Sequence, residues 1–256
     1  YGTAPALAVD YTGFVAGETK TVLAVEPTVA NGNVNVGEYT LIPAGGSDEN
    51  YSFAYANGTL TITKAELTVT ADAKNKVHGD AEPEYMATVT GLKNGDQPSI
   101  ITVDFSRVAG ENVGTYTITP SSTTVLNNYT AVFQTGTLTI AKAPLTVTAD
   151  GKTKVYDSSD PEFTATVTGL KNGDLPSIIT VDFDRETGEN VGTYAVTPSS
   201  TTVLNNYDVS FLDGVLTITP KDITISGIKA DTKVYDTLTG ATRSEERFSR
   251  NAETDL

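Results

Sequence analysis

Acidic side chains gather at corresponding places in two stretches of the chain. The first cluster holds Asp80, Glu82 and Glu84, and the second holds Asp157, Asp160 and Glu162. Paired carboxylates can serve as general acid and base, and their oxygens can also bind calcium. Either chemistry needs a fixed spacing, yet the second stretch has Ser158 where the first has Asp80. We therefore expect a solvated acidic surface without catalytic or metal-ligating residues; calcium at a junction between domains is the alternative.

Imidazole chemistry is the second candidate. His78 is the only histidine of the chain, and a tyrosine, Tyr156, stands at the corresponding position 78 residues later. The chain has no cysteine, no Gly-x-Ser-x-Gly nucleophile motif and no phosphate-binding glycine loop. We expect a structural role for His78. The sequence therefore predicts a protein that is not an enzyme and carries no cofactor.

The charge balance narrows the range of partners. The 256 residues carry a net charge of −15 and a pI near 4.3. Such a chain repels phosphate backbones and acidic lipids, so we expect neither nucleic acid nor an anionic membrane surface as a partner. No apolar run approaches the ~20 residues that span a bilayer, so we expect no direct membrane insertion of this segment. Because the chain opens at Tyr1-Gly2, we interpret it as a mature or excised piece of a longer protein.

The elements that position these residues belong to a repeating unit. The stretch from Leu67 to Ile140 returns from Leu145 to Ile218, each equivalent residue lying 78 positions later. A fixed period without slippage indicates one structural unit copied in tandem. We predict a first repeat without its opening strand at residues 1–64, complete repeats at 65–142 and 143–220, the opening strand of a fourth repeat at 221–242, and a charged tail outside the repeats at 243–256.

Alternating apolar and polar residues predict strands throughout the unit. Leu67, Val69 and Ala71 alternate with threonines, as do Leu138 and Ile140. This period of two is typical of half-buried strands, and no stretch of the repeat has helical periodicity. The sequence therefore predicts an all-β fold: a tandem array of small antiparallel β-sandwiches of the immunoglobulin-like type. A β-grasp-like repeat is the alternative.

Two short motifs add detail to this fold. Turn residues stand between two predicted strands of every copy, and they suggest a tight hairpin at Asn57-Gly58, Thr135-Gly136 and Asp213-Gly214. A tyrosine follows a glycine at the start of another strand, at Tyr39, Tyr116 and Tyr194. That arrangement resembles the tyrosine corner of immunoglobulin-like sandwiches, in which the hydroxyl bonds to upstream backbone.

The assembled motifs resemble the MBG repeats and the related YDG repeats of large bacterial surface proteins, some of them called mucus-binding proteins. Tyr1-Gly2, Gly37-Glu38-Tyr39 and Gly58–Ile62 are similar to the YGX type, and Lys233-Val234-Tyr235-Asp236 is similar to the opening of a YDG repeat. The resemblance covers about residues 1–241. It implies an extracellular, anchored protein of many repeats on the bacterial cell surface, as in stalks and adhesins, and it supplies no catalytic residues.

A stalk or spacer is the function that this organisation favours, because near-identical copies need to provide only length and stiffness. Its first partners are then the neighbouring repeats of the same chain. The alternative is an adhesin module that binds mucin or other host or matrix glycans. Aromatic residues such as Tyr55 and Phe133 could line a glycan groove, but at these strand positions we favour core or cross-strand packing.

The two ends of the array suggest a route to assembly. Residues 1–64 lack the opening strand, and residues 222–236 repeat that strand. An unpaired sheet edge can accept a strand from another chain, so one copy could complete the next, head to tail, and form a filament. The candidate donor residues are Asp222, Ile223, Thr224, Ile225, Lys233, Val234, Tyr235 and Asp236. A boundary that cuts through a repeat is the alternative explanation.

Overall fold

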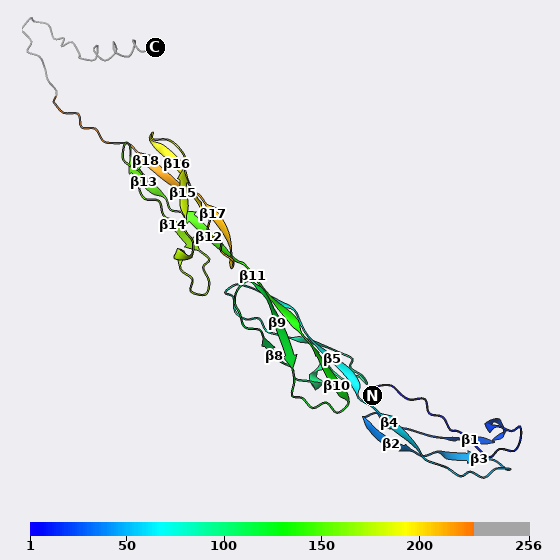
Figure 1. Ribbon diagram of the computed structural model, residues 1–256. Coiled ribbons are helices and arrows are strands. Elements are labelled where there is room, and N and C mark those ends of the chain that lie inside the picture. The colour runs from blue at the N-terminus through cyan, green and yellow to red at the C-terminus, as the bar shows by residue number, and fades with distance from the viewer. Residues whose placement is uncertain (228–256) are drawn as a thin grey trace, which may run out of the picture.

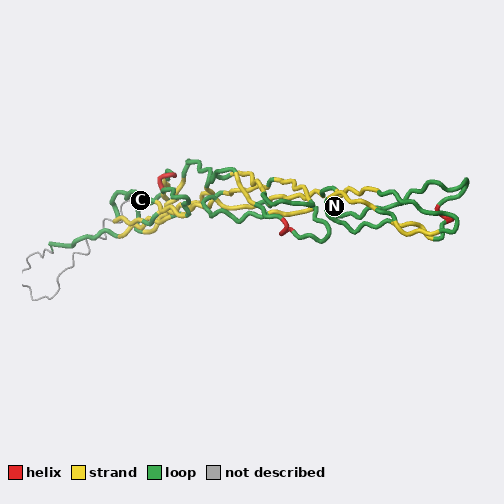
Figure 2. Tube along the Cα trace, turned by 90° about the horizontal axis from the view of Figure 1, so that it is seen from below, coloured by secondary structure: helices red, strands yellow, loops and turns green. Residues whose placement is uncertain are grey.

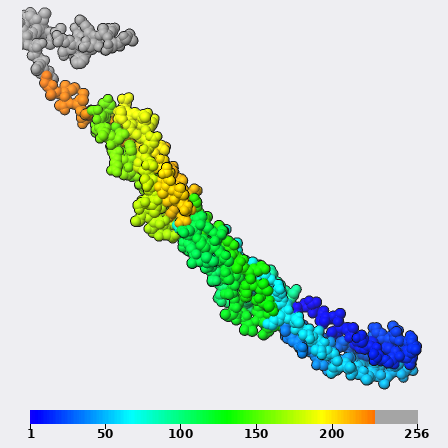
Figure 3. All heavy atoms as spheres, in the orientation of Figure 1, coloured from blue at the N-terminus to red at the C-terminus, as the bar shows by residue number. Residues whose placement is uncertain are grey.

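The computed structural model describes residues 1–227, which form three β-rich repeats in single file along an elongated rod (Figure 1; Figure 3). We call residues 1–64, 65–142 and 143–220 repeats 1, 2 and 3. Apart from three single-turn 3-10 helices, the described elements are all strands, and they run along the rod (Figure 2).

The elements recur in the same order in repeats 2 and 3. Repeat 1 contains η1 (Lys20–Val22), β1 (Val25–Thr28), β2 (Gly37–Leu41), β3 (Ala44–Ser47) and β4 (Gly58–Ile62). Repeat 2 contains β5 (Ala65–Ala71), β6 (Lys74–Val77), β7 (Ala87–Thr90), η2 (Pro98–Ile100), β8 (Asp104–Arg107), β9 (Gly114–Ser121), β10 (Tyr129–Gln134) and β11 (Gly136–Ala141). Repeat 3 contains β12 (Ala143–Ala149), β13 (Lys152–Val155), β14 (Ala165–Thr168), η3 (Pro176–Ile178), β15 (Asp182–Arg185), β16 (Gly192–Ser199), β17 (Tyr207–Leu212) and β18 (Gly214–Thr219).

Each complete repeat holds two small sheets. In repeat 2 the strand orders are β10-β5-β7 and β6-β11-β9-β8, and in repeat 3 they are β14-β12-β17 and β13-β18-β16-β15. Repeat 1 has two pairs of strands, β1-β3 and β2-β4. The predicted all-β class and the tandem repetition are therefore confirmed.

The first and last strands of a repeat run parallel and change sheets together. β5 pairs with β10 in one sheet, and their continuations β6 and β11 pair in the other, both in parallel. Repeat 3 has the same two parallel pairings. These parallel pairs depart from the antiparallel sandwich of the immunoglobulin-like type that we expected, whereas the other strand pairs of repeats 2 and 3 are antiparallel.

The expected hairpins at the Asx-Gly and Thr-Gly positions were wrong. Thr135-Gly136 joins β10 to β11, which lie in different sheets and do not pair with each other. At Gly136 a Cβ would lie 2.5 Å from the carbonyl oxygen of Ala71, and at Gly214 it would lie 2.4 Å from that of Ala149. The glycine is therefore required because the last strand crosses the first at this point, and not because a turn needs positive φ.

The opening strand supplies side chains to both halves of the core. Leu67 and Val69 pack with Ile101 and Tyr129 in one cluster, and Ala71 packs with residues of β9 and β11 in the other. Full burial of one such aliphatic side chain stabilises the fold by about 1.5–3 kcal/mol. Within repeat 1, by contrast, Pro27 is the only residue that is buried.

The candidate donor strand is only partly within the described residues. Asp222, Ile223, Thr224 and Ile225 follow β18 in an extended stretch without strand pairing, and the side chains of Ile223 and Ile225 are 83% and 86% exposed. Lys233, Val234, Tyr235, Asp236 and the tail at 243–256 lie outside the described residues.

The strand crossing gives a first prediction. Replacing Gly136 with alanine should destabilise repeat 2 by about 1–3 kcal/mol, because the added methyl group would overlap the Ala71 carbonyl and overpacking has this cost. Urea unfolding of the full chain measures the loss.

Gly58→Ala is the matched control. Gly58 occupies the equivalent position in repeat 1, where the nearest atom to an added Cβ is Leu41 Cβ at 3.8 Å. This change should stay within about 0.5 kcal/mol. Equal losses at Gly58 and Gly136 would contradict the crossing as the reason for the glycine.

Candidate functional site: the junction between repeats

The residue that follows β6 enters the next repeat. His78 is 3% exposed, and its ring meets the edge of Tyr207 in repeat 3, with the ring centroids 5.5 Å apart and the planes at 82°. Its Nδ1 lies 2.7 Å from the Glu111 carbonyl oxygen, and its Nε2 lies 3.3 Å from Asn172 Nδ2. Both nitrogens are satisfied if Nδ1 donates and Nε2 accepts, so the buried imidazole has a structural place here.

Tyr1 occupies the same place at the junction of repeats 1 and 2. Its ring meets Tyr129 with the centroids 5.2 Å apart and the planes at 78°, and its hydroxyl donates to Asp96 Oδ2 at 2.9 Å. The Tyr1 amino group donates to Thr63 O at 2.6 Å. We call Tyr1, His78 and their equivalent Tyr156 the wedge residues, because each of the first two fills the space between two repeats.

An asparagine side chain binds the neighbouring repeat beside the wedge. Asn206 Oδ1 accepts from Val113 N at 3.0 Å, and Asn206 Nδ2 donates to Asn112 Oδ1 at 3.0 Å. At the other junction Asn128 makes the same two bonds, to Val36 N at 3.0 Å and to Asn35 Oδ1 at 2.9 Å. One amide therefore spans each junction with a donor and an acceptor in a fixed orientation.

Close approach of a lysine side chain explains the glycine that follows the first two wedge residues. Gly2 and Gly79 have φ of +87° and +80°, and a Cβ on either would lie 2.4 Å from the Cβ of Lys93 or Lys171 in the next repeat. Only glycine fits both the left-handed conformation and the contact. This requirement gives the Tyr-Gly signature a physical cause.

The hydrophobic cores of repeats 2 and 3 are also in contact across the junction between these repeats. Lys142 is the single residue between β11 and β12, and Val77 packs into the core of repeat 3. Val155 and Tyr156 are the equivalents of Val77 and His78 at the far end of repeat 3, where they are 42% and 44% exposed. The same docking surface is therefore present at that end.

An ion network lies directly behind the wedge. The Lys76 side chain, 4% exposed, reaches Glu82 at 3.0 Å and Glu111 at 2.6 Å. Arg107 pairs with the same two carboxylates. Hydrogen bonds from Arg107, and then from Tyr85 and Lys76, lower the pKa of Glu82 to about 2, and bonds from Lys76 and Arg107 lower the pKa of Glu111.

Repeat 3 contains the same network in different residues. Lys154 reaches Asp160 at 2.7 Å, Arg185 reaches Asp160 at 2.6 Å, and both cations pair with Glu189. Hydrogen bonds from Lys154 and Arg185 lower the pKa of Asp160. Glu82 and Asp160, which the sequence placed in acidic clusters, are thus paired with cations. Among residues 1–227, no three His, Cys, Asp or Glu side chains group so as to hold a metal ion.

The tyrosines at the start of β2, β9 and β16 support the loop that carries the junction contacts. Tyr39, Tyr116 and Tyr194 each donate to the carbonyl four residues upstream, at 3.0, 2.8 and 2.9 Å. For Tyr116 that carbonyl belongs to Asn112, whose side chain bonds to Asn206. Arg107 lies over the Tyr116 ring at 5.4 Å, so the ion network and the tyrosine support the same loop.

Sequence reasoning missed the junction asparagine. The signal was present, because an Asn-Tyr pair recurs at Asn50, Asn128 and Asn206. Recurrence alone does not reveal that the amide faces a different repeat.

The structure was also searched for membrane-spanning helices. Within residues 1–227, no helix is both long enough and apolar enough to cross a bilayer.

The ion network predicts a pH dependence. The pKa of Glu82 is about 2 in the folded protein and 4.5 for an ordinary glutamate. The ionised Glu82 therefore stabilises the fold fully at pH values above 4.5, and this stabilisation is lost as the pH falls through 2. The free energy of unfolding should therefore fall between about pH 4.5 and pH 2 in urea titrations. Glu82→Gln should flatten this fall. Glu84→Gln, at an exposed residue without an ion pair among residues 1–227, is the control, and an equal effect of both variants would refute the assignment.

The junction asparagine gives a second prediction. Asn206→Ala removes both amide hydrogen bonds, at a cost of about 1 kcal/mol for each, and should broaden the distribution of angles between repeats 2 and 3. Spin labels on cysteines at Val125 and Val203, equivalent positions that are 85% and 82% exposed, report this as a wider distance distribution.

Asn50→Ala is the matched control for this measurement. Asn50 has the same Asn-Tyr motif, but within residues 1–227 its amide bonds to no other repeat.

Two variants of His78 test the wedge residue in the same measurement. His78→Tyr, which introduces the wedge residue of the other junction, should keep the distribution of distances narrow, whereas His78→Ala should broaden it. Identical distributions in all of these variants would mean that the junction contacts do not set the angle.

Comparison with known proteins identifies the repeat. No curated protein matches the chain. A family profile, the MBG domain (YGX type), matches residues 1–61, 67–139 and 145–217, one match in each repeat. MBG repeats are non-catalytic and are typical of surface proteins. With the Tyr-Gly signature now placed at the contact between repeats, the chain belongs to the MBG domain (YGX type) family as a tandem array of three of its repeats.

Proposed function

We propose that the chain is a stiff spacer in an extracellular protein of the bacterial surface, where it holds other parts of that protein away from the cell. The observation that carries this proposal is the equivalence of the two junctions. Both use a wedge ring on a tyrosine, one asparagine amide and one glycine against a lysine. A contact that is repeated in kind at each step sets a constant angle, and a constant angle extends an array in a predictable direction.

Short connections reinforce this stiffness. One residue separates β11 from β12, and Thr63 and Lys64 separate β4 from β5. Linkers of this length give little freedom to repeats that also share hydrogen bonds and core contacts. β10 and β11 together run from Tyr129 to Ala141, so at about 3.3 Å per residue each repeat adds roughly 40 Å to the reach.

The net charge is compatible with a crowded surface. A chain with a net charge of −15 repels its neighbours along their sides, and such repulsion keeps stalks separate and solvated. At the junction of repeats 2 and 3, by contrast, opposite charges attract: Lys171 of repeat 3 pairs with Asp80 of repeat 2 at 3.1 Å.

Removing one period tests the spacer role. Deletion of residues 68–145 joins Leu67 to Thr146 in register and places Tyr1 against Tyr207, the same kind of contact as before. The maximum dimension of the monomer in small-angle X-ray scattering should fall by roughly 40 Å, the length of one repeat.

Two results would contradict this role. A maximum dimension that does not change with the deletion would show that the repeats fold back on one another. Binding of a mucin glycan that the shortened chain retains in full would instead favour the adhesin module. The intact chain is the reference for both measurements.

A further inference from the structure

The junction of repeats 1 and 2 brings two tyrosine rings together. Tyr1 and Tyr129 meet edge to face, and among residues 1–227 this is the one ring contact that joins two tyrosines. Both hydroxyls donate to the same atom, Asp96 Oδ2, at 2.9 Å from Tyr1 and at 2.7 Å from Tyr129. The Tyr129 hydroxyl also accepts from Lys93 N at 2.8 Å, which fixes its direction. Because the two hydroxyls converge on one oxygen, the ring carbons beside them lie on the same side of the contact.

The position of the Tyr1 ring is a property of the junction, whatever precedes this residue. His78, which lies in the middle of the chain, makes the equivalent ring contact with Tyr207. The backbone nitrogen of His78 donates to Ala141 O at 2.9 Å, as the Tyr1 nitrogen donates to Thr63 O at 2.6 Å. The two wedge residues are therefore held in the same way.

The surroundings of the two phenols suit the loss of an electron together with a proton. Burial, and after it the hydrogen bond to Asp96, raises the pKa of Tyr129, so this phenol is protonated at neutral pH. A protonated phenol is oxidised most easily when its proton leaves with the electron. The Asp96 carboxylate accepts a hydrogen bond from each hydroxyl, so it can take up either proton without any movement of the rings.

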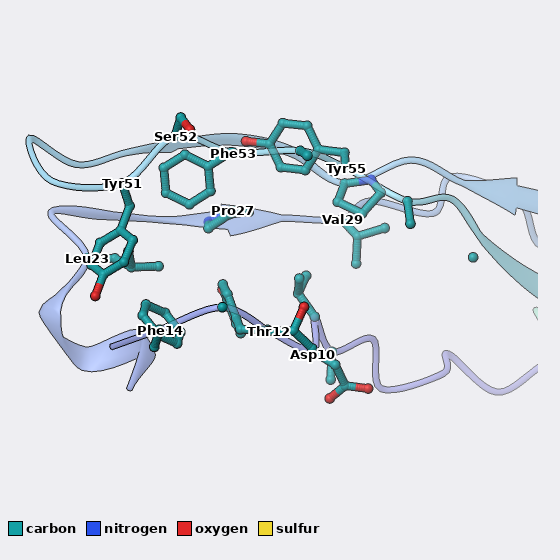
Figure 4. Close-up of a pocket in the computed structure, with 18 of the residues that line it drawn as sticks. Asp10, Thr12, Phe14, Leu23, Pro27, Val29, Tyr51, Ser52, Phe53 and Tyr55 are labelled. Atoms are coloured by element: carbon teal, nitrogen blue, oxygen red, sulfur yellow. The ribbon is translucent and has the colours of Figure 1, made fainter. Parts of the chain in front are cut away.

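The same ring geometry elsewhere lacks one of the two phenols. Tyr51, the equivalent of Tyr129 in repeat 1, meets the ring of Phe14 with the centroids 5.2 Å apart and the planes at 78° (Figure 4). Tyr207, the equivalent in repeat 3, meets His78. Within residues 1–227, chemistry that needs two phenols in contact is therefore confined to the junction of repeats 1 and 2.

Few other side chains compete for an oxidant. The chain has no cysteine, no tryptophan and a single methionine, Met86, but it has 12 tyrosines. One-electron oxidation therefore falls mainly on tyrosine, and a tyrosyl radical couples with a second phenol that is already in contact with it. For Tyr1 and Tyr129 only electrons and protons leave, so no reagent has to enter between the rings.

We propose that a one-electron oxidant, namely a haem peroxidase supplied with hydrogen peroxide, joins Tyr1 to Tyr129 as a dityrosine cross-link between repeats 1 and 2. Each phenol gives one electron to the oxidant and one proton to Asp96, which passes it to water. The two radicals couple through the carbons ortho to their hydroxyls and form one C–C bond. The hydrogen on each of these carbons is then lost while each oxygen is protonated again, which restores both phenols. Hydrogen peroxide takes up the two electrons and two protons and becomes two molecules of water.

The cross-link changes which part of the rod carries load. Tension that enters at Tyr1 passes through the new bond to Tyr129 and on through β10 and β11, so residues 2–128 form a closed loop that tension does not extend. This loop contains the rest of repeat 1, in which Pro27 is the only buried residue. The chemistry needs only the contact between the rings, so this inference does not rest on the spacer role.

Mass spectrometry of the oxidised chain tests the cross-link. The chain is treated with peroxidase and hydrogen peroxide at low protein concentration, and the monomer is isolated by size and digested with trypsin. Cleavage after lysine and arginine releases Tyr1 in the peptide 1–20 and Tyr129 in the peptide 108–142. These peptides should appear joined, with a mass two hydrogen atoms below their sum, and the monomer should gain the fluorescence of dityrosine.

Each of these peptides carries a second tyrosine, which supplies matched controls. Tyr1→Phe or Tyr129→Phe keeps the ring and should remove both the joined pair and most of the fluorescence of the monomer. Tyr11→Phe and Tyr116→Phe remove the other tyrosine of each peptide and should leave both signals unchanged. An equal loss of fluorescence in all four variants would show that the cross-link does not form at this junction.

The junction of repeats 2 and 3 allows the cross-link to be introduced. Tyr207 donates to Asp174 Oδ2 at 2.6 Å, as Tyr129 does to Asp96. His78→Tyr should therefore give a second joined pair, between the peptides 77–93 and 186–221. The proposal is wrong if the oxidised monomer of the unmodified chain lacks the first pair, or if the His78→Tyr chain forms the first pair without the second.

Discussion

Parallel pairing of the first strand with the last is the contact on which each complete repeat depends. β5 joins β10 to β7 and delivers Leu67 and Val69 to one core cluster and Ala71 to the other. Where the described chain has no such strand, in repeat 1, the flanking segments form no strands and one residue, Pro27, is buried. Sheet pairing and core formation therefore depend on the same strand, and its pairing brings together residues more than sixty positions apart, such as Leu67 and Ala131.

Alternation and period were sufficient to predict the all-β class and the tandem units. They could not predict which strands are neighbours, because a period of two fixes the face of a side chain and not the partner of its strand. Gly136 illustrates the limit. A turn residue beside a glycine is a hairpin signal, but here the glycine makes room for the Ala71 carbonyl of a crossing strand. The local sequence is compatible with either structure, and only the long-range pairing decides between them.

The site was less predictable than the fold because its partners lie far apart in sequence. Glu82 looked like one of several unpaired carboxylates, yet its main partner, Arg107, is 25 residues away. The wedge residues looked like a variable Tyr or His at the end of a strand, and their partners Tyr129 and Tyr207 belong to the following repeat. The sequence shows that a motif recurs. Its meaning emerges only when the recurring pieces of two repeats are placed against each other.

The parallel arrangement also determines how the rod carries a tensile load. Force applied to the ends of a repeat enters at the start of β5 and leaves at the end of β11, and these strands belong to neighbouring pairs that run in the same direction. Tension then shears the paired strands along each other. It loads the hydrogen bonds of both strand pairs together, rather than breaking them one after another. Because Lys142 alone connects β11 to β12, the same load passes directly into the parallel strand pairs of repeat 3. Each repeat is thereby a mechanical element that resists shear.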